Sequence, residues 1–308
     1  MEKTVYFFID DVIWVMRDLT RKRPKSLFDN EFMSMLKKAH DDNGLTVQLN
    51  LFYRTDFFYG SDEFTLSEMT DAYKKEFEEA SDWLKMAFHA KQEFPDYPYV
   101  NVSYDDMKKD YLQIINEIKR FAGEKSISDV VTLHWGASSK EGCHALRECG
   151  VRVLSCSFGE RSEFNGDMSV LPYGHAARLL QNRKPETKVF IRDTKDAAIR
   201  YSVCSYNYIT QQMYDEMFGK NTSFYDEETD LCFRKLGCGP VLNLYKIDEI
   251  EDGLKKFDGQ HFISTANHEQ YFYSDYFNYQ PDYADKVYHM SKLLKENGYR
   301  FITCEEME

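Results

Sequence analysis

The sequence predicts an α/β fold in which parallel strands alternate with helices. The apolar run from Val5 to Ile9 stops at two aspartates, which is typical of a strand buried on both faces of a parallel sheet. A helical pattern from Asn30 to His40 is followed by a second strand at Leu45 to Tyr53, which completes one βαβ unit. A length of 308 residues favours one large domain, or one domain with an insertion.

The same alternation continues through the first half of the chain. The predicted elements are a helix at about residues 65–81, strand Leu84 to Phe88, helix Tyr104 to Phe121, strand Asp129 to Leu133, helix Lys140 to Cys149 and strand Val151 to Cys156. Repeated strand-helix units of this length imply a parallel sheet or barrel.

The alternation of strands and helices stops at about residue 159. Thr187 to Arg192 and Ala197 to Tyr208 alternate like an antiparallel hairpin, and a turn-forming run joins them. We therefore expect a main domain of residues 1–158 and 240–308, with an insertion at 159–239 that either caps a pocket or makes a dimer contact. The resumed elements are strand Val241 to Tyr245, helix Ile247 to Phe257, strand His261 to Ala266, helix Ala284 to Asn297 and strand Arg300 to Cys304.

Composition excludes several classes of protein. With 39 Lys and Arg against 52 Asp and Glu, the net charge of −13 repels phosphate backbones and argues against a nucleic-acid partner. Seven scattered cysteines without a CxxC pair indicate reduced thiols rather than a disulfide scaffold. The apolar run near the start is too short for a signal peptide or a membrane span, so we expect a cytoplasmic protein without a membrane partner.

Polar residues that follow apolar strands are the candidates for chemistry, because the carboxyl ends of parallel strands face the site in such folds. Four places in the sequence meet this criterion: Asp10-Asp11, His89, His134-Trp135 and the run Asn267 to Glu269.

Asp10 and Asp11 point in different directions if they end a strand, so one can hold a metal while the other acts as a base on water. The alternative is a helix N-cap. His89 is followed four residues later by Glu93, and the two can share one face of a helical turn and chelate a divalent ion. A packed core histidine is the alternative there.

His268 and Glu269 are typical of an acid/base pair, and Tyr271 and Tyr273 then provide an aromatic wall suited to stacking on a sugar ring. The alternative is that these rings only cover the rim of the barrel. His134 and Trp135 admit the same two interpretations, as substrate-binding residues or as packing.

In this order along the chain, the motifs resemble those of the polysaccharide deacetylases, a family of the glycoside hydrolase/deacetylase barrels. Phe8 to Val12 resembles the first motif, in which two aspartates end a strand, although Val12 replaces the family's glycine. Met86 to Glu93 resembles the second motif, although Glu93 replaces its second histidine. Leu133 to Gly136 occupies the place of the third motif without matching it. Asn267 to Glu269 occupies the place of the histidine that comes late in the family's sequences.

The resemblance implies an irregular (β/α)7 TIM-like barrel that carries the inserted antiparallel β-containing segment. It also implies a metal-dependent hydrolase of an acylated sugar or small glycan, with a divalent ion, zinc by preference, as cofactor. The implied roles are metal binding by Asp11, His89 and Glu93, general base for Asp10, and general acid for His268 oriented by Glu269.

Two other functions are compatible with these residues. A metal-independent glycosidase would use Asp10 and Glu269 as paired carboxylates, at a separation of roughly 5 to 5.5 Å if it retains configuration. A catalytically silent carbohydrate-binding barrel would explain the departures from the family motifs.

Overall fold

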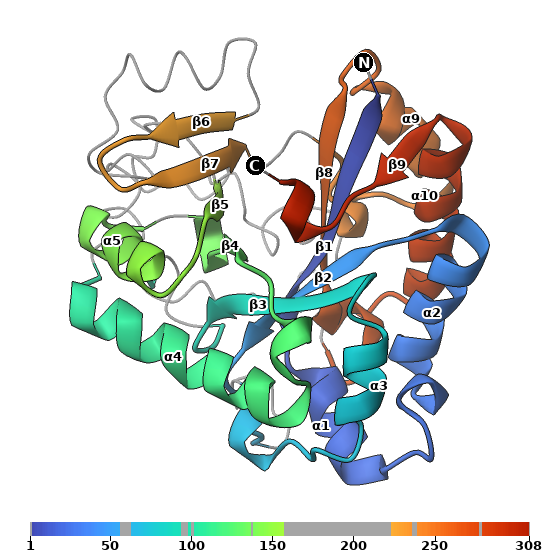
Figure 1. Cartoon of the computed structure of the whole chain (residues 1–308). Helices are drawn as coiled ribbons and strands as arrows, with labels where there is room; N and C mark the ends of the chain where they lie inside the picture. The colour runs from blue at the N-terminus through green and yellow to red at the C-terminus, as the bar shows by residue number, and fades with distance from the viewer. Residues whose placement is uncertain are drawn as a thin grey trace, which may run out of the picture.

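The computed structural model describes residues 2–55, 63–93, 98–99, 102–136, 138–156, 223–235, 239–276 and 279–307. Parallel strands alternate with helices, as the sequence predicts (Figure 1). The strands are β1 (Lys3–Val12), β2 (Val47–Phe52), β3 (Leu84–Ala90), β4 (Val130–Thr132), β5 (Val153–Cys156), β6 (Ser223–Asp226), β7 (Leu231–Lys235), β8 (Phe262–His268) and β9 (Tyr299–Phe301).

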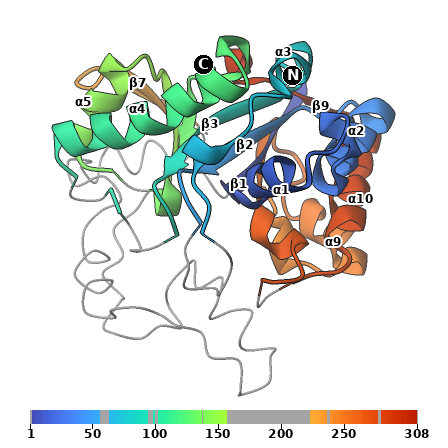
Figure 2. The same ribbon diagram turned by 90° about the horizontal axis from the view of Figure 1, so that it is seen from below.

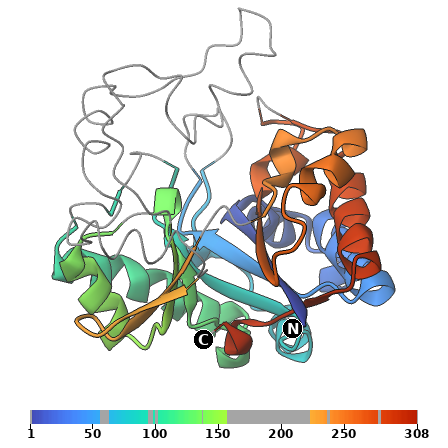
Figure 3. The same ribbon diagram turned by 90° about the horizontal axis from the view of Figure 1, so that it is seen from above.

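The helices of the described residues cover the outside of these strands. They are α1 (Trp14–Lys22), α2 (Glu31–Asn43), α3 (Lys74–Glu79), α4 (Tyr104–Phe121), α5 (Lys140–Glu148), α9 (Ile250–Lys255) and α10 (Tyr283–Glu296). α2 packs against α10, and α4 packs against α5. Figures 2 and 3 show β1, β2 and β3 between these two helix pairs.

Two sheets form the irregular α/β barrel. The first has the order β3-β2-β1-β8, with β9 also paired to β1, and the second has the order β4-β5-β7-β6. A parallel bridge between Met86 and Ile127 links the edge of the first sheet to the segment that leads into β4. All of these pairings are parallel except β6 with β7. The predicted α/β barrel is confirmed.

Local sequence explains where the early elements begin and end. β1 is buried from Val5 to Val12, which includes the apolar run that ends at Ile9 and the two aspartates that follow it. The side chain of Asn30 accepts hydrogen bonds from the backbone N–H groups of Phe32 and Met33 and so caps the start of α2. Gly44, with a φ of 76°, ends that helix in the left-handed conformation that glycine adopts without strain.

The middle of the chain differs from the predicted organisation. The predicted hairpin at 187–208 lies outside the described residues. Within the predicted insertion, β6 and β7 form an antiparallel pair, and β7 also runs parallel to β5 as a barrel strand. The predicted helix at 65–81 is instead a 3-10 turn, Leu66–Glu68, followed by the short α3.

The barrel interior has an apolar end and a polar end. Tyr6 and Phe8 alternate along β1 and pack with Val130, Val153 and residues of the C-terminal segment. The next inward position along β1 is Asp10, because successive side chains of a strand point to opposite faces. Among the described residues, no helix is both long and apolar enough to cross a bilayer.

Candidate functional site

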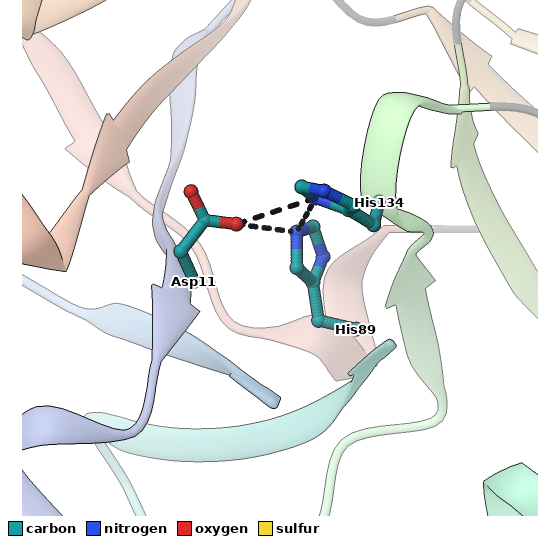
Figure 4. Close-up of side chains that lie close together, drawn as sticks. All are labelled: Asp11, His89 and His134. Atoms are coloured by element: carbon teal, nitrogen blue, oxygen red, sulfur yellow. Dashed lines mark hydrogen bonds and ion pairs between the residues drawn. The ribbon is translucent and has the colours of Figure 1, made fainter. Parts of the chain in front are cut away.

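Three buried side chains converge at the carboxyl ends of the strands. Asp11 belongs to the end of β1, His89 to the end of β3, and His134 to the 3-10 turn His134–Gly136 that follows β4. The Asp11 Oδ1 atom lies 3.1 Å from His89 Nε2 and 3.3 Å from His134 Nδ1, and these two nitrogens are 3.2 Å apart. Figure 4 shows the three atoms facing one another.

A β-bulge brings both aspartates to this place. Ile9 pairs with Leu49 and Val12 with Leu51, so β1 has one more residue than β2 over this stretch. Asp11 takes the extra position, with a φ of 61°. Without the bulge Asp10 and Asp11 would face opposite sides of the sheet. With it, both carboxylates approach the imidazole of His89, at 3.7 Å and 3.1 Å.

The backbone on the other side of the cluster is unusual as well. Trp135, directly after His134, has a φ of 65°. Left-handed φ is uncommon for residues other than glycine, asparagine and aspartate, and it persists where the surrounding structure imposes it. The segment that supplies His134 is therefore held in a conformation that its own sequence does not favour, whereas the aspartate at position 11 tolerates its left-handed φ.

Backbone carbonyl groups determine the tautomers of the two histidines. His89 Nδ1 lies 2.5 Å from the carbonyl oxygen of Thr132, and His134 Nε2 lies 2.9 Å from that of Glu93. A carbonyl oxygen only accepts, so each of these nitrogens donates its hydrogen outward. The opposite nitrogens, His89 Nε2 and His134 Nδ1, then point their lone pairs toward Asp11.

Three electron-pair donors around one point favour a cation between them. Burial acts to lower the pKa of His89, yet the carboxylates of Asp10 and Asp11 raise it above its usual value. Burial acts to raise the pKa of Asp11, and the hydrogen bonds of His134 and His89 outweigh it, so that this pKa stays well below its usual range. The surroundings of the cluster therefore stabilise a positive charge at this place.

The geometry of the cluster fits a divalent metal. Ligand atoms bound tetrahedrally at zinc distances are roughly 3.3 to 3.4 Å apart, close to the observed 3.1 to 3.3 Å. One carboxylate and two imidazoles also form the three-ligand set that leaves a coordination position open for water or substrate. Gln270 donates from Nε2 to Asp11 Oδ2 at 2.7 Å, which turns Oδ1 toward the histidines.

Asp10 lies beside the cluster in a different environment. Burial, with the charge of Asp11 adding to it, raises the pKa of Asp10 to about 7, against the opposing effects of His89 and Asn50. Asn50 donates from Nδ2 to Asp10 Oδ1 at 2.7 Å. Gln48 fixes the orientation of Asn50 by donating to its Oδ1 at 2.7 Å. A carboxyl group with a pKa near neutrality is suited to proton transfer.

His268 ends β8 next to Asp10, with which it pairs in the parallel ladder. Asn243 Oδ1 accepts from the backbone N–H of His268 at 2.9 Å and contacts its Nδ1 at 3.0 Å. A backbone N–H always donates, so the atom it meets is the oxygen of the amide, and His268 Nδ1 must donate to that oxygen too. The hydrogen on His268 Nδ1 is therefore committed to Asn243.

Glu269, which the sequence suggests as a catalytic residue, contacts the start of a helix. Both of its carboxylate oxygens accept backbone hydrogen bonds at the start of α1, from Ile13, Trp14 and Val15, at 2.7 to 2.8 Å. α1 has no capping side chain of its own, so Glu269 caps it from across the chain. The predicted orientation of His268 by Glu269 is likewise replaced by Asn243.

The other predicted site residues lie around the cluster without joining it. Glu93 contributes its backbone carbonyl to His134, and its carboxylate lies 3.4 Å from Gln270 Nε2. Trp135 is half-buried against His134. Tyr271 and Tyr273 are 1% and 8% exposed, and they pack in an aromatic group with Trp14 and Tyr276.

Sequence reasoning missed Gln270, Asn50 and Asn243, and it gave His134 a substrate-binding role. One signal was present in the sequence: Gln48 and Asn50 alternate within the otherwise apolar run of β2. Because they are two residues apart, both face the barrel interior.

The comparisons with known proteins give a fold. No family model and no curated protein matches the sequence. The solved 4-alpha-glucanotransferase of Thermococcus litoralis is similar with a TM-score of 0.54 and 10% identity over 99% of this chain, which spans 40% of the glucanotransferase. This identity and TM-score show a shared fold and carry no statement about activity.

Deacetylases are also among the similar structures. The Bc1960 peptidoglycan N-acetylglucosamine deacetylase has a TM-score of 0.46 and 9% identity, covering 99% of this chain and 88% of its own. The family 4 carbohydrate esterase of Streptomyces lividans has a TM-score of 0.44 and 8% identity, covering 99% of this chain and 95% of its own.

Proposed function

We propose that this protein is a metal-dependent hydrolase that removes an acyl group from a sugar or small glycan. The single observation that carries the proposal is the convergence of Asp11 Oδ1, His89 Nε2 and His134 Nδ1 within 3.1 to 3.3 Å of one another. We infer that these three atoms bind a divalent ion, zinc being the ion that best suits such a donor set. His134 then takes the ligand role that the sequence motifs suggest for Glu93.

A bound divalent ion would polarise the acyl carbonyl group and lower the pKa of water at the site. Asp10 would accept the proton of the attacking water, since its pKa lies near neutrality. The hydrogen bond from Asn50 to Oδ1 holds the carboxyl group in place. His268 would protonate the leaving amine from Nε2. To do so it must carry both ring protons, with Nδ1–H donating to Asn243.

The glycosidase alternative lacks support from the contacts of Glu269. A paired carboxylate must reach the sugar, whereas both oxygens of Glu269 accept backbone N–H groups of α1. A binding protein without catalysis would not require three lone-pair donors to converge. The arrangement of Asp11, His89 and His134 therefore favours hydrolysis with a metal over both alternatives.

The test is metal content by elemental analysis after zinc loading, combined with acetate release from N-acetylated chito-oligosaccharides. We expect about one zinc per chain in the wild type and a large loss in Asp11→Asn, His89→Ala and His134→Ala. Glu93→Gln is the matched control and should keep its metal, because the backbone carbonyl that contacts His134 remains. Asp10→Asn should keep the metal and lose acetate release.

Two results would overturn parts of the proposal. A wild type that binds no zinc, manganese or cobalt after loading would eliminate the metal-dependent mechanism. A loss of metal in Glu93→Gln with retention in His134→Ala would restore Glu93 as the third ligand.

A further inference from the structure

A chain of buried polar side chains inside the barrel ends at Asp10. Gln48 and Asn50, both on β2, are 2% and 0% exposed. Gln48 Nε2 donates to Asn50 Oδ1 at 2.7 Å, and Asn50 Nδ2 donates to Asp10 Oδ1 at 2.7 Å. The three residues therefore form one directed chain of hydrogen bonds that leads to the proposed general base.

The pairing of β1 with β2 brings these side chains together. The two strands are parallel, and Phe8 lies beside Gln48 in their register. Asp10 and Asn50 are each two residues further along, so they are the next residues of their strands on the inner face. The chain of hydrogen bonds thus follows from the register and from the two amides of β2.

Gln48 also reaches the second sheet. Its Nε2 atom donates to the backbone carbonyl oxygen of Val130, in β4, at 2.9 Å. A carbonyl oxygen only accepts, so Val130 determines which end of the Gln48 amide points toward Asn50. Because that end is the donor, Asn50 must present its Oδ1 to Gln48 and its Nδ2 to Asp10.

The orientation of the Asn50 amide decides how Asp10 is held. A reversed amide would place a carbonyl oxygen against an ionised carboxylate, and two acceptors do not form a hydrogen bond. In the observed orientation Asn50 holds Oδ1 of Asp10. This arrangement leaves the other carboxylate oxygen, Oδ2, to receive a proton from water.

The two amides are not explained by stability. Gln48 Oε1 is buried and has no hydrogen-bond partner among the described residues. A buried acceptor without a partner destabilises a fold. The neighbours Phe8 and Val130 belong to an apolar cluster, in which apolar side chains would avoid this cost.

We propose that Gln48 is a positioning residue, which holds Asp10 in the orientation for proton transfer by fixing the amide of Asn50. This inference rests on the proposed function and extends it, because it assigns support of the general base to a residue one side chain away from that base. A role that acts through Asn50 predicts that the effects of removing the two amides do not add.

The test is steady-state acetate release by zinc-loaded protein from the trimer of N-acetylglucosamine. Gln48→Met keeps an unbranched side chain and removes the amide, and we expect kcat to fall about three- to tenfold with KM unchanged. Asn50→Leu should lower kcat about 10- to 100-fold. The double variant should match Asn50→Leu alone, since Gln48 then has no amide to orient.

Asn43→Leu is the matched control for the loss of a buried amide. Asn43 is 7% exposed, and its Nδ2 atom donates to Ser291 of α10 at 2.9 Å. We expect a lower midpoint of urea denaturation with kcat unchanged. Gln48→Met should show the reverse, a midpoint that is kept or raised with a lower kcat, which a purely structural role would not produce.

An unchanged kcat in Gln48→Met, or a double variant in which the two losses multiply, would overturn the inference. A wild type without acetate release would refute the hydrolase instead, and the positioning role is then tested by the crystal structure of Gln48→Met. We expect Asn50 Nδ2 to lie more than about 3.5 Å from Asp10 Oδ1 in that structure. An intact contact there would overturn the positioning role whether or not the protein is a hydrolase.

Discussion

The two ends of the barrel interior are built by the same strands and have opposite chemistry. On β1, Tyr6 and Phe8 pack in an apolar cluster with Val130 and Val153, whereas Asp10, the next inward residue, faces His89. The apolar end is stabilised because folding removes apolar side-chain surface from water. The polar end gathers buried carboxylates and imidazoles that are costly unless each is paired. The stabilising apolar cluster and the candidate site therefore occupy separate ends of one strand.

The largest expected effect is at the apolar end. Phe8→Ala removes a fully buried ring, and we expect the free energy of unfolding to fall by about 3 to 5 kcal/mol. The folded protein should still bind metal, since no contact of the cluster is altered. Urea denaturation with parallel zinc analysis measures both quantities. A Phe8→Ala variant of wild-type stability that lacked metal would break the separation of the two ends.

A second effect, measured as a slope against pH, concerns Glu269 at the polar end. Burial raises the pKa of Glu269 to about 8, although three backbone N–H groups oppose it. In the unfolded chain this pKa is roughly 4.3. Between these two values the folded state binds more protons than the unfolded state, so stability contributed by this group is present at low pH and is lost as pH rises toward 8.

Glu269→Gln should therefore make the decline of unfolding free energy between about pH 4.5 and pH 8 shallower. The slope should change by at most about 1.4 kcal/mol per pH unit. Denaturation curves of the metal-free proteins at several pH values provide the measurement. Parallel pH profiles for the variant and the wild type would show that Glu269 is ionised throughout.

The smallest expected effect concerns Gln270, which touches the cluster without belonging to it. Gln270→Ala removes the hydrogen bond to Asp11 Oδ2, and loss of such a supporting contact typically weakens metal affinity about 10- to 100-fold. Competition with a zinc chelator measures the change. Gln92→Ala serves as a control, because its carbonyl oxygen accepts from Arg54 rather than from the cluster. Equal zinc affinity in Gln270→Ala and wild type would contradict the positioning role.

Much of the barrel could be predicted because its signals are local. The apolar run of β1, the Asn30 cap and the Gly44 stop of α2 are properties of neighbouring residues. α1 could not be found in this way. Its first residues are apolar like those of β1, and the carboxylate that caps it, Glu269, is more than 250 residues away.

The candidate site also combines residues that local sequence reveals with residues that only distant contacts bring together. Asp10, Asp11, His89 and His268 are recognisable because each follows an apolar strand. The position of His134 beside Asp11 could not be recognised in this way, because the orientation of its ring depends on a contact with the backbone carbonyl of Glu93, 41 residues away. Residues 94–97, beyond Glu93, and the predicted hairpin lie outside the described residues.

The sequence alone therefore determined the alternation of strands and helices and the polar residues at the strand ends, because hydrophobic periodicity and strand termini are encoded within a few residues. Only the tertiary structure decided which of those polar residues meet. The bulge that turns Asp11 toward His89 and His134, and the helix start that occupies Glu269, arise from contacts between segments distant in the chain. Such contacts have no signature in any single stretch of sequence.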